Sequence, residues 1–351
     1  MKIVSIVGAR PQFIKAAGLS REIRKRHAEV LVHTGQHYDY AMSGIFFDGL
    51  ELPSPDVNLG VGSGSHGEQT GAMLIAIEQV LAAHRPDRVV VYGDTNSTLA
   101  GALAAAKLHI PIVHVEAGLR SFKREMPEEI NRVVADHLSA LLLCPSKTSI
   151  ANLAAEGVTK GVHLVGDVML DVLNWAKAFA CAKSRNLLHQ LQVAERQYLI
   201  VTVHRSENTD SPERLSGIIQ ALNAINEPIV FPVHPRTRKM INHGHGFQLR
   251  SHIRPIEPLG YIDMVALSQS ARLILTDSGG LQKEAYWLGV PCITLRDETE
   301  WVETVESGWN TLAGSDTERI VQVVNAVTPR NGRLHLYGKG HVSARCAELI
   351  G

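Results

Sequence analysis

The sequence predicts an α/β protein made of two Rossmann-like domains with parallel sheets. Three observations support this fold class. Short apolar runs rich in β-branched residues alternate with segments of helical periodicity along almost the whole chain. These runs are apolar throughout, which is typical of parallel strands buried on both faces. The length of 351 residues suits two domains of ordinary size better than one large core.

The expected strands fall into two groups separated by a gap. They are, in order, Ile3–Val7, Val30–His33, Val89–Tyr92, Ile112–Val115, Leu141–Leu143 and Val162–Val165, then Leu199–Val203, Ile229–Val233, Ile253–Glu257, Leu273–Thr276 and Cys292–Leu295. The gap, residues 171–196, is polar and helical in pattern, and we place the interdomain connection there. This predicts a first domain over 1–170 and a second over 171–333. A last helix, near 334–351, is expected to pack back on the first domain.

Composition narrows the class of function. Lys+Arg and Asp+Glu both number 35, so the formal net charge is zero and no overall basic field attracts nucleic acid or anionic lipid. No apolar run reaches the ~18–20 residues of a membrane span, and the first residues read as a strand, not a signal peptide. The four cysteines are far apart among apolar neighbours, which predicts buried thiols rather than disulfides or a metal site. We therefore expect a cytoplasmic protein with no nucleic-acid or membrane partner.

Ligands of open α/β sheets bind beyond the carboxyl ends of the strands, so the residues that follow each strand are the candidates for function. After the first strand, Gly8 permits a tight turn and Pro11 suits the first turn of a helix, whose free N–H groups favour an anion. Arg10 and Lys15 add two cations there, or are simply solvated. The pattern is neither GxGxxG nor a P-loop, so it indicates no nicotinamide cofactor and no ATP.

Acidic residues follow two neighbouring strands of the first half and begin a later helix. Asp94 follows Val89–Tyr92, where it is either an N-cap or a reactive group. Glu116 follows Ile112–Val115, and Glu128 and Arg132 are spaced i,i+4 so that they can share a helix face. A cluster of carboxylates at one sheet edge can raise the pKa of one member towards neutrality, which suits proton transfer.

The second half carries cationic and glycine-rich turns. His204 and Arg205 follow one strand, and His234 follows the next in a similar arrangement, so both are candidates for phosphate contact. Ser278, Gly279 and Gly280 join the strand Leu273–Thr276 to a helix, and their backbone N–H groups can approach a diphosphate. Glu284, further along that helix, can accept hydrogen bonds from ribose hydroxyls.

Taken together, these motifs resemble the non-hydrolysing UDP-N-acetylglucosamine 2-epimerases. The resemblance runs in order over nearly the whole chain, and its segments are Gly8–Pro11 with Lys15, Gly93–Thr95, His114–Arg120, Pro127–Arg132, His204–Asn208 and Thr276–Gly280. It implies the two-domain arrangement also used by GT-B glycosyltransferases, with the active site in the interdomain cleft. It also implies inversion at C2 through elimination and re-addition of UDP, without metal or cofactor, in the supply of sugars for cell-surface polysaccharide.

The resemblance assigns roles by position. The catalytic residues it implies are Asp94, Glu116, Glu128 and His204. The positions it implies for binding of the UDP-sugar substrate and of UDP are Arg10, Lys15, Ser278, Gly279, Gly280 and Glu284, with Arg132 supporting the carboxylates; we add Arg205 and His234 from the strand-end pattern. We expect a homodimer.

Several positions depart from the commonest family pattern. Ala9 and Gln12 stand where Thr and Glu are common, Trp301 stands where many members have an arginine after Thr-Glu, and Met264 replaces a Phe near the uracil of some members. Segments near Gly8–Ala16, 33–37 and 299–303 look closest to a subgroup that acts on UDP-2,3-diacetamido-2,3-dideoxyglucuronate in O-antigen synthesis. That sugar is therefore the alternative substrate.

Activation by substrate at a second site, known in some bacterial members, is not expected. Gln36 and His37 fit part of that pattern, but Met73 and Asp39 replace other parts of it. Three other functions remain open: a GT-B glycosyltransferase, a non-catalytic UDP-sugar sensor, and a hydrolysing epimerase that releases free sugar.

Overall fold

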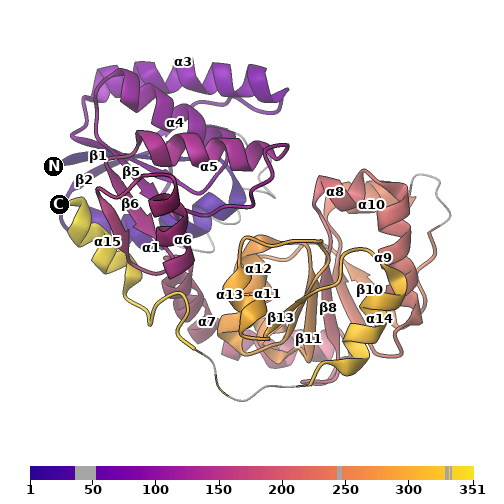
Figure 1. Ribbon diagram of the computed structural model, residues 1–351. Helices are drawn as coiled ribbons and strands as arrows, with labels where there is room; N and C mark the ends of the chain where they lie inside the picture. Colours follow the sequence, from indigo (N-terminus) through magenta and orange to yellow (C-terminus); the bar gives the residue numbers. More distant parts are fainter. Residues whose placement is uncertain (36–52, 243–246, 329–331, 333) are drawn as a thin grey trace. The chain divides into compact units, whose positions relative to one another are not determined.

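The computed structural model describes residues 1–35, 53–242, 247–328, 332 and 334–351, and it divides into two compact units (Figure 1). The first unit comprises Met1–Trp175 and His335–Gly351, and the second comprises Ala176–Leu334. The chain passes from the first unit to the second within α7 (Met169–Gln190).

A seven-stranded parallel sheet forms the centre of the first unit, in the order β3-β2-β1-β4-β5-β6-β7. Its strands are β1 (Lys2–Val7), β2 (Ala28–His33), β3 (Val57–Asn58), β4 (Arg88–Tyr92), β5 (Ile112–Val115), β6 (Leu141–Cys144) and β7 (Val162–Leu164). In the register of the sheet, Val91 of β4 lies between Ile6 of β1 and His114 of β5. The turns after these three strands therefore come to one edge of the sheet.

Helices cover both faces of this sheet. They are α1 (Arg10–Arg24), α3 (His66–His84), α4 (Asn96–Lys107), α5 (Pro127–Leu138), α6 (Lys147–Ala155) and α15 (Val342–Ile350). Helices α3 and α4 pack on Val4, Ile6, Val89 and Val91 in the main apolar core of the unit. Helix α15, the end of the chain, lies against α1, and Figure 1 shows this pair beside the sheet near the N-terminus.

The second unit repeats the plan with a six-stranded parallel sheet in the order β10-β9-β8-β11-β12-β13. Its strands are β8 (Leu199–Thr202), β9 (Ile229–Pro232), β10 (Ile253–Ile256), β11 (Leu273–Thr276), β12 (Cys292–Thr294) and β13 (Asn310–Leu312). Its helices are α8 (Ser206–Thr209), α9 (Pro212–Ala224), α10 (Pro235–Asn242), α11 (Tyr261–Ser270), α12 (Gly279–Leu288), α13 (Val302–Glu306) and α14 (Thr317–Ala326). Apolar clusters lie on both faces of the sheet, one with α9 and α14 and one with α11 and α12.

The α/β class with parallel sheets is confirmed, and each of the eleven predicted strands is present. Two strands were not predicted: β3 and β13, which lie at the outer edges of their sheets. The prediction that every cysteine is buried is wrong for Cys181, which is exposed on α7, while Cys144, Cys292 and Cys346 are buried. Among the described helices, none combines the length and the apolar character needed to cross a membrane.

Candidate functional site

In the first unit, a lysine and a glutamate form a buried ion pair at the sheet edge. Lys15, on the first turns of α1, contacts the Glu116 carboxylate through its ammonium group, and each side chain is 7% exposed. Glu116 has a φ of +72°, a backbone conformation rarely adopted by residues other than glycine. Gly93, with a φ of +60°, lies against the pair: a Cβ added there would come within 2.9 Å of the Lys15 Nζ atom.

Asp94, the next residue, pairs with an arginine of α5. Arg132 donates one hydrogen bond to the Asp94 carboxylate and another, of 3.2 Å, to Glu129. Two roles were open for Asp94, a helix N-cap or a reactive group. The N-cap of α4 is Thr95, so Asp94 is not the cap. The backbone carbonyl of Asp94 also accepts a hydrogen bond from Asn131.

Glu128 and Arg132 were expected to share a helix face, but the acidic partners that the structure shows for Arg132 are Asp94 and Glu129. Glu129 is buried and also accepts hydrogen bonds from the backbone N–H groups of Ser121 and Phe122. Within the described part of the chain, Glu128 has no hydrogen-bond or ion-pair partner, and it is partly exposed. Its carboxylate is therefore accessible to a ligand.

The sequence suggested repulsion between carboxylates at this edge, with Arg132 in support of them, and the structure adds a second cation, Lys15. Asp94 and Glu116 each have a cationic partner, Arg132 and Lys15, so repulsion between like charges does not dominate this edge. Charge-assisted pairing of this kind fixes the side chains in place. Within the described residues, no group of three or more His, Cys, Asp or Glu side chains could hold a metal ion.

The turn from β1 into α1 is organised by Gln12. Its side-chain carbonyl accepts hydrogen bonds from the N–H groups of Gly8 and Ala9, and its amide group donates to the Tyr92 carbonyl and to Thr98. Gln12 is 1% exposed, so this departure from the family pattern serves the scaffold of the unit. Arg10 begins α1, but its side chain lies outside the described residues.

In the second unit, a buried aspartate orients His204. The Asp277 carboxylate lies 3.0 Å from the Nδ1 atom of His204 and accepts hydrogen bonds from the backbone N–H groups of His204 and Arg205 and from Asn208. Burial raises the pKa of Asp277, but His204 and the backbone donors outweigh burial and hold that pKa below its ordinary value. The carboxylate therefore accepts the Nδ1 proton, and Nε2 is left for a ligand on a side chain that is 37% exposed.

The glycine turn follows β11, and His204 follows shortly after β8. These two strands are neighbours in the sheet, so the turn and the histidine lie at the same sheet edge. Ser278 caps α12 by accepting a hydrogen bond from the N–H group of Leu281, and Gly279 and Gly280 open the helix. A Cβ on Gly279 would come within 2.6 Å of a Glu300 carboxylate oxygen. Glu300 in turn pairs with Arg296 at 2.9 Å, and Arg205 lies 3.9 Å from its other oxygen.

The remaining predicted positions are placed as follows. Glu284 is buried on α12, and the His234 ring lies 5.7 Å from that of His204, centroid to centroid. The Lys283 ammonium lies 3.7 Å from the centre of the Trp301 ring, so the tryptophan has a buried cation over its face.

Five further positions bear on the departures noted in the sequence. Met264 and Met73 are both buried in apolar clusters. Gln36, His37 and Asp39, on which the expectation about a second substrate site partly depends, lie outside the described residues.

Sequence reasoning gave no role to four residues that organise these sites: Glu129, His114, Asp136 and Asp277. His114 and Asp277 stand inside the motifs that were singled out, and Glu129 is adjacent to Glu128. For these three the available signal was their place in the chain, since each lies within two residues of a predicted catalytic or binding residue. Asp136 gave no such signal, because its contact with His114 spans 22 residues.

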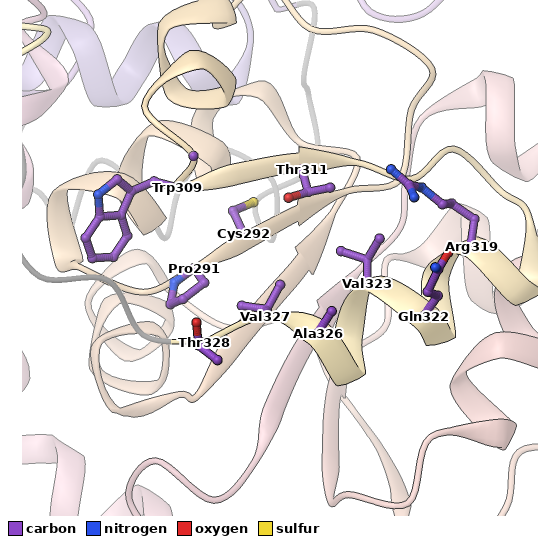
Figure 2. Close-up of a pocket in the computed structure, with 11 residues that line it drawn as sticks. Pro291, Cys292, Trp309, Thr311, Arg319, Gln322, Val323, Ala326, Val327 and Thr328 are labelled. Carbon is purple, nitrogen blue, oxygen red and sulfur yellow. The ribbon is translucent and has the colours of Figure 1, made fainter.

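A hollow of about 260 Å³ also occurs in the second unit, at the edge away from the glycine turn (Figure 2). Pro291 and Trp309, at the amino ends of β12 and β13, line it together with α14. Ligands of parallel sheets bind at the carboxyl ends, so we assign this hollow no role in the reaction.

Comparison with known proteins adds a family. A family described as UDP-N-acetylglucosamine 2-epimerase matches residues 21–351. A UDP-N-acetylglucosamine 2-epimerase homolog of Methanococcus maripaludis is 52% identical, over 100% of this chain and 99% of its own length. The UDP-2,3-diacetamido-2,3-dideoxy-D-glucuronate 2-epimerase of Pseudomonas aeruginosa is 46% identical over the same shares.

Solved structures agree with these sequence relatives. The UDP-GlcNAc 2-epimerase of Methanocaldococcus jannaschii, in complex with UDP-GlcNAc and UDP, is 43% identical with a TM-score of 0.92, covering 100% of this chain and 99% of that one. The calicheamicin glycosyltransferase CalG4 is similar in fold alone, at 14% identity and a TM-score of 0.54 over 99% of this chain and 92% of that one.

Proposed function

Because the chain belongs to the UDP-N-acetylglucosamine 2-epimerase family, we propose that it inverts C2 of a UDP-linked 2-acetamido sugar, of the UDP-N-acetylglucosamine to UDP-N-acetylmannosamine type. As a member of this family the protein is an epimerase, and so an isomerase, with the GT-B-like pair of parallel sheets. The proposal depends chiefly on one observation: Gly93, the residue before Asp94, packs against the Lys15–Glu116 ion pair.

The proposed reaction is an elimination followed by a re-addition. A carboxylate takes the C2 proton, the C2–H electron pair forms the C1=C2 double bond, and UDP leaves C1 with the electrons of the C–O bond. A proton is then delivered to the opposite face of C2, and the UDP oxygen bonds to C1 again. The result is a 2-acetamidoglucal intermediate and an inverted C2, with no net change in redox state.

The carboxylates of the first unit suit the proton steps. Asp94 and Glu116 are fixed by Arg132 and Lys15, so each can exchange a proton at a defined position, and Glu128 is accessible to a ligand. The second unit suits the leaving group. The N–H groups of Gly279 and Gly280 at the start of α12, with Arg205 and His204, can bind the diphosphate and stabilise its charge as the C1–O bond breaks.

Solvent deuterium tests the reaction. The full chain is incubated with UDP-N-acetylglucosamine in D2O without an acceptor, and the sugar is analysed by NMR and mass spectrometry. Deuterium at C2 and the appearance of the manno epimer are expected. An unlabelled, unchanged sugar would refute epimerisation; this is the result that a glycosyltransferase or a non-catalytic sensor would give. Accumulation of free sugar with UDP would indicate a hydrolysing epimerase.

Four variants test the site. Asp94→Asn, Glu116→Gln, Glu128→Gln and His204→Asn are each expected to lower turnover by ~10²–10⁴-fold, the usual contribution of a single acid–base group. Glu195→Gln, a change at an exposed position before β8, is the control and should keep the wild-type rate. Wild-type rates in all four variants would contradict the assignment.

A second candidate substrate is UDP-2,3-diacetamido-2,3-dideoxyglucuronate, because the Pseudomonas aeruginosa 2-epimerase named for that sugar is 46% identical over the whole chain. Presenting both nucleotide sugars to the enzyme and comparing kcat/KM decides between them. The homodimeric state and the cytoplasmic location stay predictions, which light scattering of the purified chain and cell fractionation test.

A further inference from the structure

His114 of β5 lies beneath the proposed reactive carboxylates and makes two strong hydrogen bonds. Its Nε2 atom is 2.7 Å from the carbonyl oxygen of Gly93, and its Nδ1 atom is 2.7 Å from a carboxylate oxygen of Asp136 on α5. Both side chains are 0% exposed. No step of the proposed reaction uses either residue.

Both ring nitrogens must carry a proton in this arrangement. A carbonyl oxygen only accepts hydrogen bonds, so Nε2 donates to Gly93. Asp136 is also an acceptor, since it receives hydrogen bonds from the backbone N–H group of Gly118 and from Arg120 at 2.7 Å. The buried guanidinium of Arg120 forms an ion pair with Asp136 and favours its ionised form, so the carboxylate has no proton to donate to Nδ1. Nδ1 therefore donates as well, and the ring is an imidazolium.

This pair connects the two turns that carry the proposed catalytic groups. The Gly93 carbonyl immediately precedes Asp94, and the Gly118 N–H group lies two residues after Glu116. Gly93, Glu116 and Gly118 all have positive φ angles, of +60°, +72° and +80°. The two glycines adopt such angles without strain, whereas Glu116 keeps its angle only where neighbouring groups hold it.

We propose that His114 is a positioning residue, held as an imidazolium ion, that sets the geometry of Asp94 and Glu116 through the Gly93 carbonyl and through Asp136. The expected effect of His114 on the reaction rate rests on the proposed function. The protonation state of His114 can be measured independently of activity. Asp136 is the matching anion, and Arg120 in turn pairs with Glu156, an exposed residue, so the four charges sum to zero.

Histidine NMR of the full chain is the first test. The protein is labelled with ¹⁵N-histidine, and one-bond ¹H–¹⁵N ring correlations are recorded from pH 6 to pH 9. One ring is expected to keep protons on both nitrogens above pH 8, where the exposed histidines have become neutral. A spectrum in which no ring keeps both protons would overturn the proposal, whether or not the enzyme is active.

Kinetics of His114→Gln are the second test. A glutamine can serve one of the two partners but not both, so we expect the doubly protonated signal to vanish and kcat to fall on the order of 10²-fold, as for small misplacements of reacting groups. Affinity for UDP, measured by calorimetry, should stay within about 2-fold, because the proposed diphosphate site is in the other unit.

His163→Gln, on β7 of the same sheet, is the matched control and should retain both kcat and the NMR signal. An unchanged kcat in a folded His114→Gln variant would refute the positioning role. Absence of turnover in the wild type would instead refute the proposed function, and it would leave the NMR result standing. If His114→Gln does not fold, the wild-type spectrum still decides the protonation state.

Discussion

At the scale of single residues, each unit orients one histidine with one buried aspartate. Asp136 holds His114 in the first unit, and Asp277 holds His204 in the second. The difference lies in exposure, 0% for the His114 side chain and 37% for that of His204. The same pairing therefore leaves His114 buried inside the first unit, whereas it leaves His204 exposed enough to contact a ligand.

The Asp277→Asn variant tests the role of this aspartate. Asparagine keeps the shape of the aspartate side chain but has one acceptor oxygen in place of two. At least one of the donors now bonded to Asp277, from His204, Arg205 or Asn208, would therefore lose its acceptor. We expect a loss of about 1–3 kcal/mol in the free energy of unfolding, measured with urea, together with a reduced kcat. Asp210→Asn breaks an exposed pair with Arg236 and is the control, with an expected cost of about 0–1 kcal/mol. Equal effects of the two changes would contradict the prediction.

Two glycines with almost the same backbone angle separate strain from function. Gly93 has a φ of +60° and Gly60 a φ of +61°, so alanine at either position is expected to cost about 1–2 kcal/mol of stability. A Cβ at Gly93 also meets Lys15, whereas nothing lies within 4 Å of one at Gly60. Gly93→Ala should therefore disturb the Lys15–Glu116 pair and lower kcat on the order of 10²-fold. Gly60→Ala should keep the wild-type kcat, and a similar loss of rate in both variants would show that strain alone is responsible.

At the scale of elements, the buried strands could be predicted because their environment is uniform. The bounds of β5 and β11 were predicted correctly, since parallel strands covered on both faces are mostly apolar, with His114 and Thr276 as the polar members of these two. The edge strands β3 and β13 were missed because pairing with a neighbour, not composition, makes them strands. The candidate site followed the same rule. Asp94, Glu116 and His204, which follow strands, were singled out, but Asp277, directly after β11, was given no role. Glu129 and Asp136 were missed because they act from a helix through contacts that the sequence does not show.

Helix α12 offers a prediction about an anion site. Its first residue, Gly279, has no room for a Cβ, which would approach Glu300 to 2.6 Å and the Trp301 indole nitrogen to 3.3 Å. Gly279→Ala is expected to shift this turn and weaken UDP binding by about 10-fold, or ~1.4 kcal/mol, in calorimetry. In Gly71→Ala, within α3, the added Cβ meets nothing within 4 Å, so helix propensity should slightly stabilise the protein and leave the affinity unchanged. Unchanged UDP affinity in Gly279→Ala would exclude this turn from the binding site.

At the scale of the whole molecule, each unit contains a fully buried carboxylate whose pKa is lowered in the folded state, Asp136 in the first and Asp277 in the second. An aspartate of the unfolded chain titrates near ~3.9. As the pH falls through that value, the unfolded state binds protons that the folded state does not. The contribution of Asp136 and Asp277 to the free energy of unfolding is therefore complete above about pH 5 and is lost as the pH falls below about 4.

Urea unfolding followed by circular dichroism from pH 6 to pH 3 measures this dependence. We expect the free energy of unfolding to be level at the upper end and to decrease steadily at the lower end. Asp136→Asn should lower stability at pH 6, because Arg120 and His114 lose their buried anion, and it should flatten the decrease at low pH, because the titrating group is gone. A decrease of the same steepness in the variant and the wild type would show that exposed carboxylates, and not the buried network beneath the proposed site, set the acid limit of this fold.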